Sequence, residues 1–224
     1  MDLRIFRKEW NADQKRLRGL FKEGSDLQAA KELFFKQHHV LHSAIVNGQD
    51  GWSYADEVFS DVTTQGFRQV PEGEEHSLLW ILWHISRIED ITMRVLVENV
   101  DQEYLSGGWE DKLVSRIHHT GNAAPPEDMV YLTQTLNHKV LLDYRNAVGN
   151  NTRKIVTALA WDKLIEKVQP DRLERLILEG AVLPEAEGLV EYWGRRVNYE
   201  LLLMPPTRHL MVHLNEARSI KEKI

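Results

Sequence analysis

The chain has 224 residues, of which 42% are hydrophobic and 28% charged, and its formal net charge is −6. This composition can build an apolar core and excludes a largely disordered chain. The mildly acidic balance argues against nucleic acid or an anionic membrane surface as a partner. The absence of cysteine excludes disulfides, thiolate nucleophiles and cysteine-ligated metals.

The sequence divides into an N-terminal extension, residues 1–24, and one helical domain, residues 25–224. We expect the extension to be solvated or to form a short helix. Its first residues are charged and lack a long apolar segment, which is not typical of a signal peptide. The longest apolar runs, such as residues 78–83, are too short to cross a bilayer. We therefore expect a cytoplasmic protein without membrane contact.

Apolar residues at helical spacing predict the first elements of the domain. One helix is expected from an N-cap at Ser25 to about Asn47, where Gly48 ends it, and a short helix near residues 54–62 follows. Residues 75–99 contain no Gly or Pro, and their apolar positions recur at spacings of three and four. This pattern predicts a long helix with one stripe facing the core.

The second half of the chain is punctuated by Gly and Pro. Residues 100–136 are expected to be a connection with short helices, followed by a long helix from about Lys139 to Leu159 with a kink or an interruption at residues 149–151. An irregular stretch ends near Pro184. Helix is then expected over residues 187–203 and 207–221, with a break or restart at the intervening prolines. Together these elements predict an all-α protein, a four-helix bundle with extra short helices in long connections.

Three histidines form a candidate metal site. His209 and His213 are four residues apart on a predicted helix, a spacing that places both rings on one face, as in helical metal-binding pairs. His84 occupies the apolar stripe of the helix over residues 75–99, where a residue such as Leu would be expected. The three residues predict a site for one divalent metal ion. The alternative is that all three are structural histidines with hydrogen-bond partners.

A second pair, His38 and His42, has the same spacing on the first predicted helix of the domain. One of them could be a fourth ligand, or both could lie beside the site. A di-iron bundle is not expected, because no histidine has a glutamate three residues before it. Glu216 could orient His213 or be a solvated charge, and the second interpretation is favoured. No catalytic residue is identified.

Aromatic and basic residues give two further candidates. Trp80, Trp83 and residues 192–193 could line a pocket, although aromatic residues at helical spacing are more often core. Arg195 and Arg196 could meet an anionic substrate, but surface salt bridges are the favoured interpretation.

Two segments, EHSLLWILWHISRIEDITM at 75–93 and MPPTRHLMVHLNEARSIK at 204–221, resemble the DinB-like family, also called the DinB/YfiT-like metalloenzymes. The resemblance implies a four-helix bundle with up-down-down-up order. It also implies a divalent metal held by one histidine of the second helix and a His-x-x-x-His pair of the fourth, here His84, His209 and His213. The segments 100–136 and 160–186 exceed the compact family pattern, so no member's substrate is carried over.

A three-histidine site leaves an ion with open positions for water or substrate, where it would act as a Lewis acid or lower the pKa of bound water or of a thiol. Zinc or nickel is expected first, then iron or manganese. Because some similar proteins are thiol S-transferases and some act in detoxification, we expect a metal-dependent transferase or hydrolase with a small-molecule substrate such as a low-molecular-weight thiol. The alternative is a non-enzymatic helical protein that binds a small ligand or a partner. Leftover apolar helix faces predict a homodimer.

Overall fold

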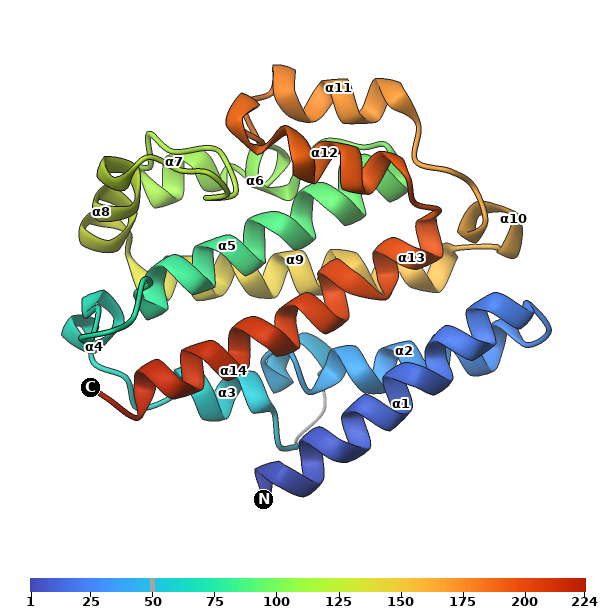
Figure 1. The fold of residues 1–224 in the computed structure, drawn as a ribbon, viewed down its shortest axis with the longest axis horizontal. Helices are drawn as coiled ribbons and strands as arrows, with labels where there is room; N and C mark the ends of the chain where they lie inside the picture. Colours follow the sequence, from blue (N-terminus) through green and yellow to red (C-terminus); the bar gives the residue numbers. More distant parts are fainter. Residues whose placement is uncertain (49–50) are drawn as a thin grey trace.

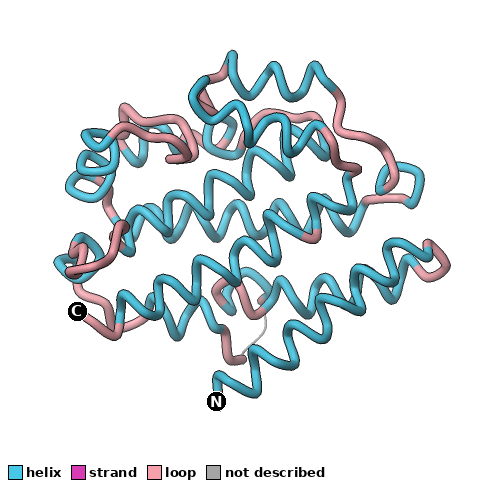
Figure 2. The backbone as a smooth tube through the Cα atoms, in the orientation of Figure 1, coloured by secondary structure: helices cyan, strands magenta, loops and turns pink. Residues whose placement is uncertain are grey.

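The regular secondary structure of this protein is helical throughout the part that a computed structural model describes, residues 1–48 and 51–224 (Figures 1 and 2). The expectation of an all-α protein is therefore confirmed. Apart from an isolated bridge between Lys167 and Val197, these residues form no β pairing. None of the described helices combines the length and hydropathy needed to cross a membrane.

Five long helices run roughly along the long axis of the molecule in Figure 1: α1 Leu3–Glu23, α2 Leu27–His39, α5 Leu78–Asp90, α9 His138–Ala158 and α14 Leu210–Lys221. Two π-helical segments, η2 Ile91–Glu98 and η4 Met204–His209, follow α5 and precede α14. The remaining elements are short: α3 Tyr54–Phe59, α4 Thr64–Arg68, α6 Glu103–Ser106, α7 Trp109–Leu113, α8 Pro126–Thr135, α10 Trp161–Leu164, α11 Pro170–Leu178, α12 Glu187–Gly194, α13 Asn198–Leu202, η1 Ala44–Asn47 and η3 Pro184–Ala186.

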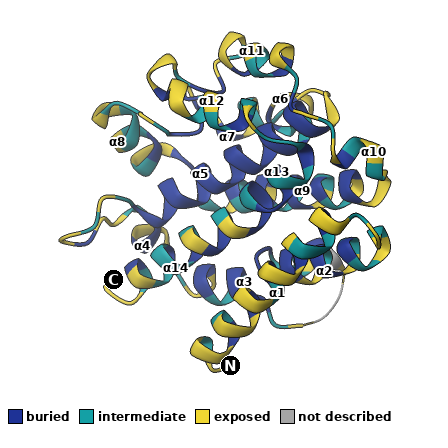
Figure 3. Cartoon of the chain, turned by 45° about the vertical axis from the view of Figure 1, so that its right-hand side comes forward, coloured by how far each residue is buried: buried dark blue, intermediate teal, exposed yellow. Residues whose placement is uncertain are grey.

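Helix α5 lies at the centre of the structure. It begins after Ser77, whose hydroxyl accepts a hydrogen bond from the Trp80 backbone at 3.1 Å, and all of its residues are buried (Figure 3). Helices α9 and α14 pack against it, and the short helices α4, α6 and α8 also contact it. The helix predicted over residues 75–99 is thus confirmed as α5 and η2, although it begins at Leu78. Its α5 part is buried on every face rather than along one stripe.

Helix α1 is long and packed, which corrects the expectation for the first residues of the chain. Trp10, Leu17 and Phe21 are buried, and the Gln14 amide donates to the Leu203 carbonyl at 2.8 Å. The prediction of a solvated extension or a short helix is wrong, because an apolar stripe of α1 packs on α2. The domain division at residue 24 stays a prediction.

Helix α2 is shorter than predicted. It begins after Asp26 rather than Ser25 and ends at His39 rather than Asn47. The chain turns there because residues at the start of α3 donate hydrogen bonds to the Val40 and His42 carbonyls, which a longer α2 would use for its own backbone. The Tyr54 backbone donates to the Val40 carbonyl at 2.9 Å, and the Ser53 hydroxyl donates to the His42 carbonyl at 2.5 Å.

Glycine does not interrupt α9, where a kink at residues 149–151 was expected. Instead, Gly149 allows close approach, since a methyl group there would overlap the His42 ring. Between residues 160 and 183, the stretch expected to be irregular contains α10 and α11. The helix expected over residues 187–203 is divided into α12 and α13.

The two prolines of η4 do not break the C-terminal run, which continues from α13 through η4 into α14. Proline has no backbone N–H, so the carbonyls one turn earlier lose their α-helical donors. The Thr207 hydroxyl donates to one of them, the Leu202 carbonyl, at 2.9 Å. The π-helical winding carries the chain across the prolines to His209.

The packing of α1 gives a test. Trp10→Ala should lower the free energy of unfolding by about 3 kcal/mol, because it removes a large buried side chain and leaves a cavity. Ile5→Ala on the same helix is the control and should change it by less than about 0.5 kcal/mol, since Ile5 is 53% exposed. Urea unfolding measures both. If the two substitutions lowered the free energy of unfolding equally, α1 would be a solvated extension and not a packed helix.

Candidate metal centre

His84, His209 and His213 converge from three elements, as the sequence predicted. His84 lies on α5, His209 ends η4, and His213 lies one turn further along on α14. Each offers one ring nitrogen, and these nitrogens lie within 4.8 Å of one another. We call these residues the three-histidine site. The histidines that the sequence singled out therefore form a group that could hold a metal ion.

The tautomers of two of the three rings, His84 and His213, suit a metal ion. The Nδ1–H of His84 donates to the Thr120 carbonyl at 2.8 Å, and the Nδ1–H of His213 donates to a Glu216 oxygen at 2.8 Å. Since a neutral imidazole carries one proton, both Nε2 atoms keep a free lone pair. Partners that fix the outer nitrogen in this way are typical of metal-ligating histidines.

The spacing of the nitrogens also suits an ion. Nε2 of His84 and Nε2 of His209 face each other at 3.1 Å. Two nitrogens bound at about 2.1 Å to one tetrahedral ion are about 3.4 Å apart. Without an ion, His209 must donate to His84. With an ion, both Nε2 lone pairs would bind it, and the proton of His209 would move to Nδ1, which has no partner among the described residues.

Glu216 orients the site and is not the solvated charge that the sequence favoured. Its second oxygen accepts a hydrogen bond from Nδ1 of His76 at 2.6 Å. Burial opposes ionisation of Glu216, but the hydrogen bonds from His213 and His76 outweigh it and lower its pKa to about 2. The His76 ring stacks on Trp80 at 3.7 Å, and Trp80 stacks on His84 at 4.8 Å. Sequence analysis missed His76, which precedes the helix.

Burial also favours the neutral form of two of the three rings, those of His84 and His209. It lowers the pKa of His84 to about 3, with a further contribution from His213. Burial likewise holds the pKa of His209 well below its ordinary value. Neutral imidazole is the form that binds metals, because protonation occupies the lone pair.

A cavity of about 330 Å³ opens onto the three histidines. Its walls are mainly apolar, with Asn122 and the Tyr192 phenol as polar residues; the others are Trp80, Ile88, Leu189, Trp193, Met204 and Pro205. Three of the aromatic residues that the sequence proposed thus line the cavity. The fourth, Trp83, is core, and its indole donates to the His119 carbonyl at 2.9 Å.

His38 and His42 form a separate group with Glu89 of α5, which we call the Glu89 cluster. All three side chains are fully buried. Nε2 of His38 donates to one Glu89 oxygen at 3.1 Å, and Nε2 of His42 donates to the other at 2.8 Å. The Thr152 hydroxyl adds a bond of 2.6 Å, and the Arg145 guanidinium lies 3.6 Å away. This group also has ligand atoms within 4.8 Å of one another and could hold an ion.

The two groups differ in how well a cation suits them. In the Glu89 cluster the Nε2 atoms already donate to the carboxylate, and a cation would lie beside the positive Arg145. Binding through Nε2 would move each proton to Nδ1, and no partner for the Nδ1 atoms of His38 and His42 lies among the described residues. Two buried donors would then be unsatisfied, which is costly. In the three-histidine site no carboxylate takes the inner protons, and only one outer nitrogen, Nδ1 of His209, lacks a partner among the described residues, while the Nδ1 atoms of His84 and His213 have acceptors.

Other sequence candidates lie apart from both groups. Arg195 pairs with Glu191 at 2.8 Å on the surface, as favoured. Arg196 lies over the Tyr192 ring at 4.3 Å.

No protein-family model and no curated protein sequence matches this chain. The case for function therefore rests on the chemistry of the residues.

The Glu89 cluster predicts a loss of stability on mutation. Glu89→Gln should lower the free energy of unfolding by about 3 kcal/mol, because it leaves buried donors and Arg145 without a charged acceptor. Glu98→Gln, exposed at the end of η2, is the control and should have an effect of less than about 0.5 kcal/mol. Urea unfolding of the metal-free protein tests this. Equal free energies of unfolding for Glu89→Gln and Glu98→Gln would contradict the hydrogen-bonded pairing of the Glu89 cluster.

The same cluster predicts how stability depends on pH. Burial, helped by Arg145, lowers the pKa of His42 to about 3, and burial also lowers that of His38. Below pH of about 6.5 the unfolded chain binds protons that the folded protein does not, so stability falls as pH falls. Each such histidine contributes up to about 1.4 kcal/mol per pH unit in this window.

Urea unfolding of the metal-free protein between pH of about 7.5 and about 5 measures this slope. We expect stability to be nearly constant at the upper end and to decline below pH of about 6.5. A constant value throughout would mean that His38 and His42 take up protons in the folded state.

Proposed function

We propose that this protein is a divalent-metal-dependent enzyme whose ion is held by His84, His209 and His213. The observation that carries the proposal is the pair of outer hydrogen bonds, from His84 to the Thr120 carbonyl and from His213 to Glu216. These bonds turn unprotonated nitrogens toward one point. A purely structural role for the three rings would not require this arrangement.

An ion held by three imidazoles supplies Lewis acidity at its open positions. The residues of the chain would supply the rest of the chemistry. Trp193 and Leu189 would exclude water from the cavity, while Asn122 and Tyr192 would orient a substrate by hydrogen bonds. Glu216 would hold His213 in its ligating tautomer.

We further propose that the chain is a DinB-like protein, with α2, α5, α9 and the α13–η4–α14 run as the four helices of an up-down-down-up bundle. The position of the two resembling segments supports this, because they coincide with α5 and with η4–α14. Zinc or nickel remains the first metal proposed, then iron or manganese. The proposed substrate is a small molecule, for which a low-molecular-weight thiol and a hydrolysable compound are the two candidates.

Metal content tests the proposal. Protein purified without a His-tag or added metal should hold near one ion per chain by elemental analysis. His84→Ala, His209→Ala and His213→Ala should each lower zinc affinity by more than about 100-fold, while Glu216→Gln, which removes only an outer partner, should lower it by about 10–100-fold. Full metal content in both His209→Ala and His213→Ala would refute the site.

Three further variants serve as controls. His118→Ala and His119→Ala should leave the ion in place, because these rings lie outside both groups. His42→Ala should also retain one ion. Two ions in the unmodified protein and one in His42→Ala would instead assign the second ion to the Glu89 cluster.

A further inference from the structure

A basic cleft adjoins the metal cavity. Its volume is about 220 Å³, and four of the nine residues that line it are cationic, against one carboxylate, Glu200. The cations come from separate parts of the chain: Arg18 and Lys22 from α1, Arg196 from the turn after α12, and Arg208 from η4. We call these four residues the basic cleft.

The charge of the cleft is locally uncompensated. The chain as a whole has 34 acidic and 28 basic residues, yet among the described residues only Arg196 of the four cations pairs with a carboxylate. Its distance to Glu200 is 3.8 Å. Like charges gathered in one hollow repel each other and attract anions. The cleft is thus a surface at which an anionic group would be stabilised.

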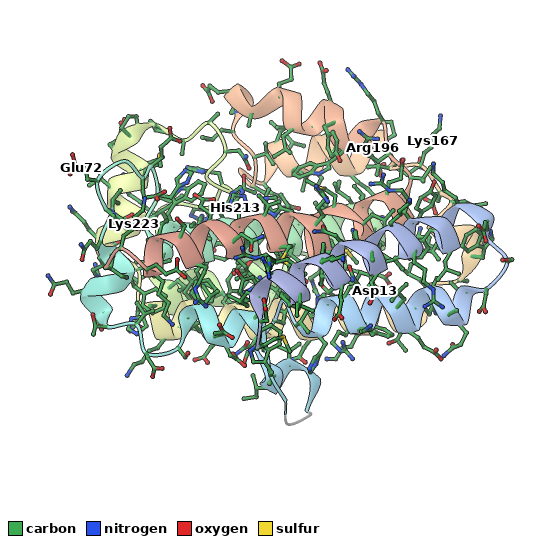
Figure 4. All side chains as sticks on the ribbon, turned by 60° about the horizontal axis from the view of Figure 1, so that its bottom comes forward. Asp13, Glu72, Lys167, Arg196, His213 and Lys223 are labelled. Carbon is green, nitrogen blue, oxygen red and sulfur yellow. The ribbon has the colours of Figure 1, made fainter. Side chains whose placement is uncertain are left out.

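The cleft and the metal cavity are neighbours. Tyr192 and Met204 line both. Met204 begins η4 and His209 ends it five residues later, a little more than one helical turn, so the cleft and the ligand lie close together along this segment. Figure 4 labels Arg196 near the start of the α13–η4–α14 run and His213 further along it. A single small molecule could span this separation.

We propose that the basic cleft binds the anionic group, a carboxylate or a phosphate, of a substrate whose other end reaches the three-histidine site. This inference rests on the proposed function, because the metal would receive the reacting end. Arg196 is the preorganised member, since its guanidinium lies over the Tyr192 ring at 4.3 Å. The substrate class is therefore a small organic anion with its charge about one helical turn from the reacting atom.

Cobalt-loaded protein provides the test, with thiols as probes because a thiolate bound to cobalt absorbs light. Three probe series are compared: mercaptoalkanoates, the matching mercaptoalkanols and the matching phosphonates, with chains of about two to six carbons to bracket the separation. We expect the anionic probes to bind about tenfold tighter than the alcohols at the best length, since each exposed ion pair contributes about two- to fivefold. The stronger of the two anionic series identifies the preferred group.

A charge-matched pair of variants assigns the advantage to the cleft. The Arg18→Gln/Lys22→Gln variant should lose most of it, whereas Lys15→Gln/Arg16→Gln should keep it. All four side chains are exposed on α1, but only the first two line the cleft. Circular dichroism and cobalt uptake should match the unmodified protein in both variants, because neither pair contacts the ligands.

The outcomes separate the two proposals. Cobalt uptake with equal affinity for acid, phosphonate and alcohol at every length would overturn the anionic substrate and leave the metal site standing. No cobalt uptake would instead refute the metal site. Calorimetry with inorganic phosphate on metal-free protein would then decide on the cleft: binding weakened by Arg18→Gln/Lys22→Gln alone supports it, and equal binding in both variants overturns it.

Discussion

The burial of α5 on every face is the constraint on which the rest of the structure depends. The helix carries His84, Arg87, Glu89 and Asp90, and a buried polar group without a partner destabilises the fold. All four find partners outside the helix, and three of them, His84, Arg87 and Asp90, bond to the long connection after η2. Arg87 binds the His118 carbonyl at 2.8 Å, and Asp90 accepts from the Tyr104 backbone at 2.9 Å. His84 donates to the Thr120 carbonyl, and Glu89 accepts hydrogen bonds from His38 and His42. The long connection after η2 is thereby held against α5, and it places the Thr120 carbonyl behind His84.

Much of this could be predicted from spacing alone. The i,i+4 interval of His209 and His213 and the apolar setting of His84 identify the three-histidine site, because helical geometry places such residues on known faces. The end of the buried helix was predicted at Asn99, which adopts a left-handed conformation there, whereas the start was predicted at Glu75 and lies after the Ser77 cap. Local sequence determines these features, so no knowledge of the tertiary structure is needed.

Features that depend on distant partners could not be predicted in the same way. Glu89 and Arg87 resemble the solvated face of an amphipathic helix, and their partners lie tens of residues away in sequence. One signal was present: residues 78–83 are apolar without interruption. Six consecutive positions cover every face of a helix with 3.6 residues per turn, which indicates burial all round and hence pairing of any charge that follows. The run was interpreted only as too short for a membrane.

The two histidine groups show why residue type alone does not define a metal site. His209 and His213 share the i,i+4 spacing of His38 and His42, and both pairs meet a side chain of α5. The two groups differ in which ring nitrogens of the histidines donate hydrogen bonds, and to which partners. A carbonyl and Glu216 accept the Nδ1 protons of His84 and His213 in the three-histidine site, which leaves the inner nitrogens of these two rings free. In the Glu89 cluster the carboxylate itself accepts the inner protons, and the nearby Arg145 compensates its charge. The position of the carboxylate, outside one group and inside the other, therefore separates a site suited to an ion from a buried ion-pair network.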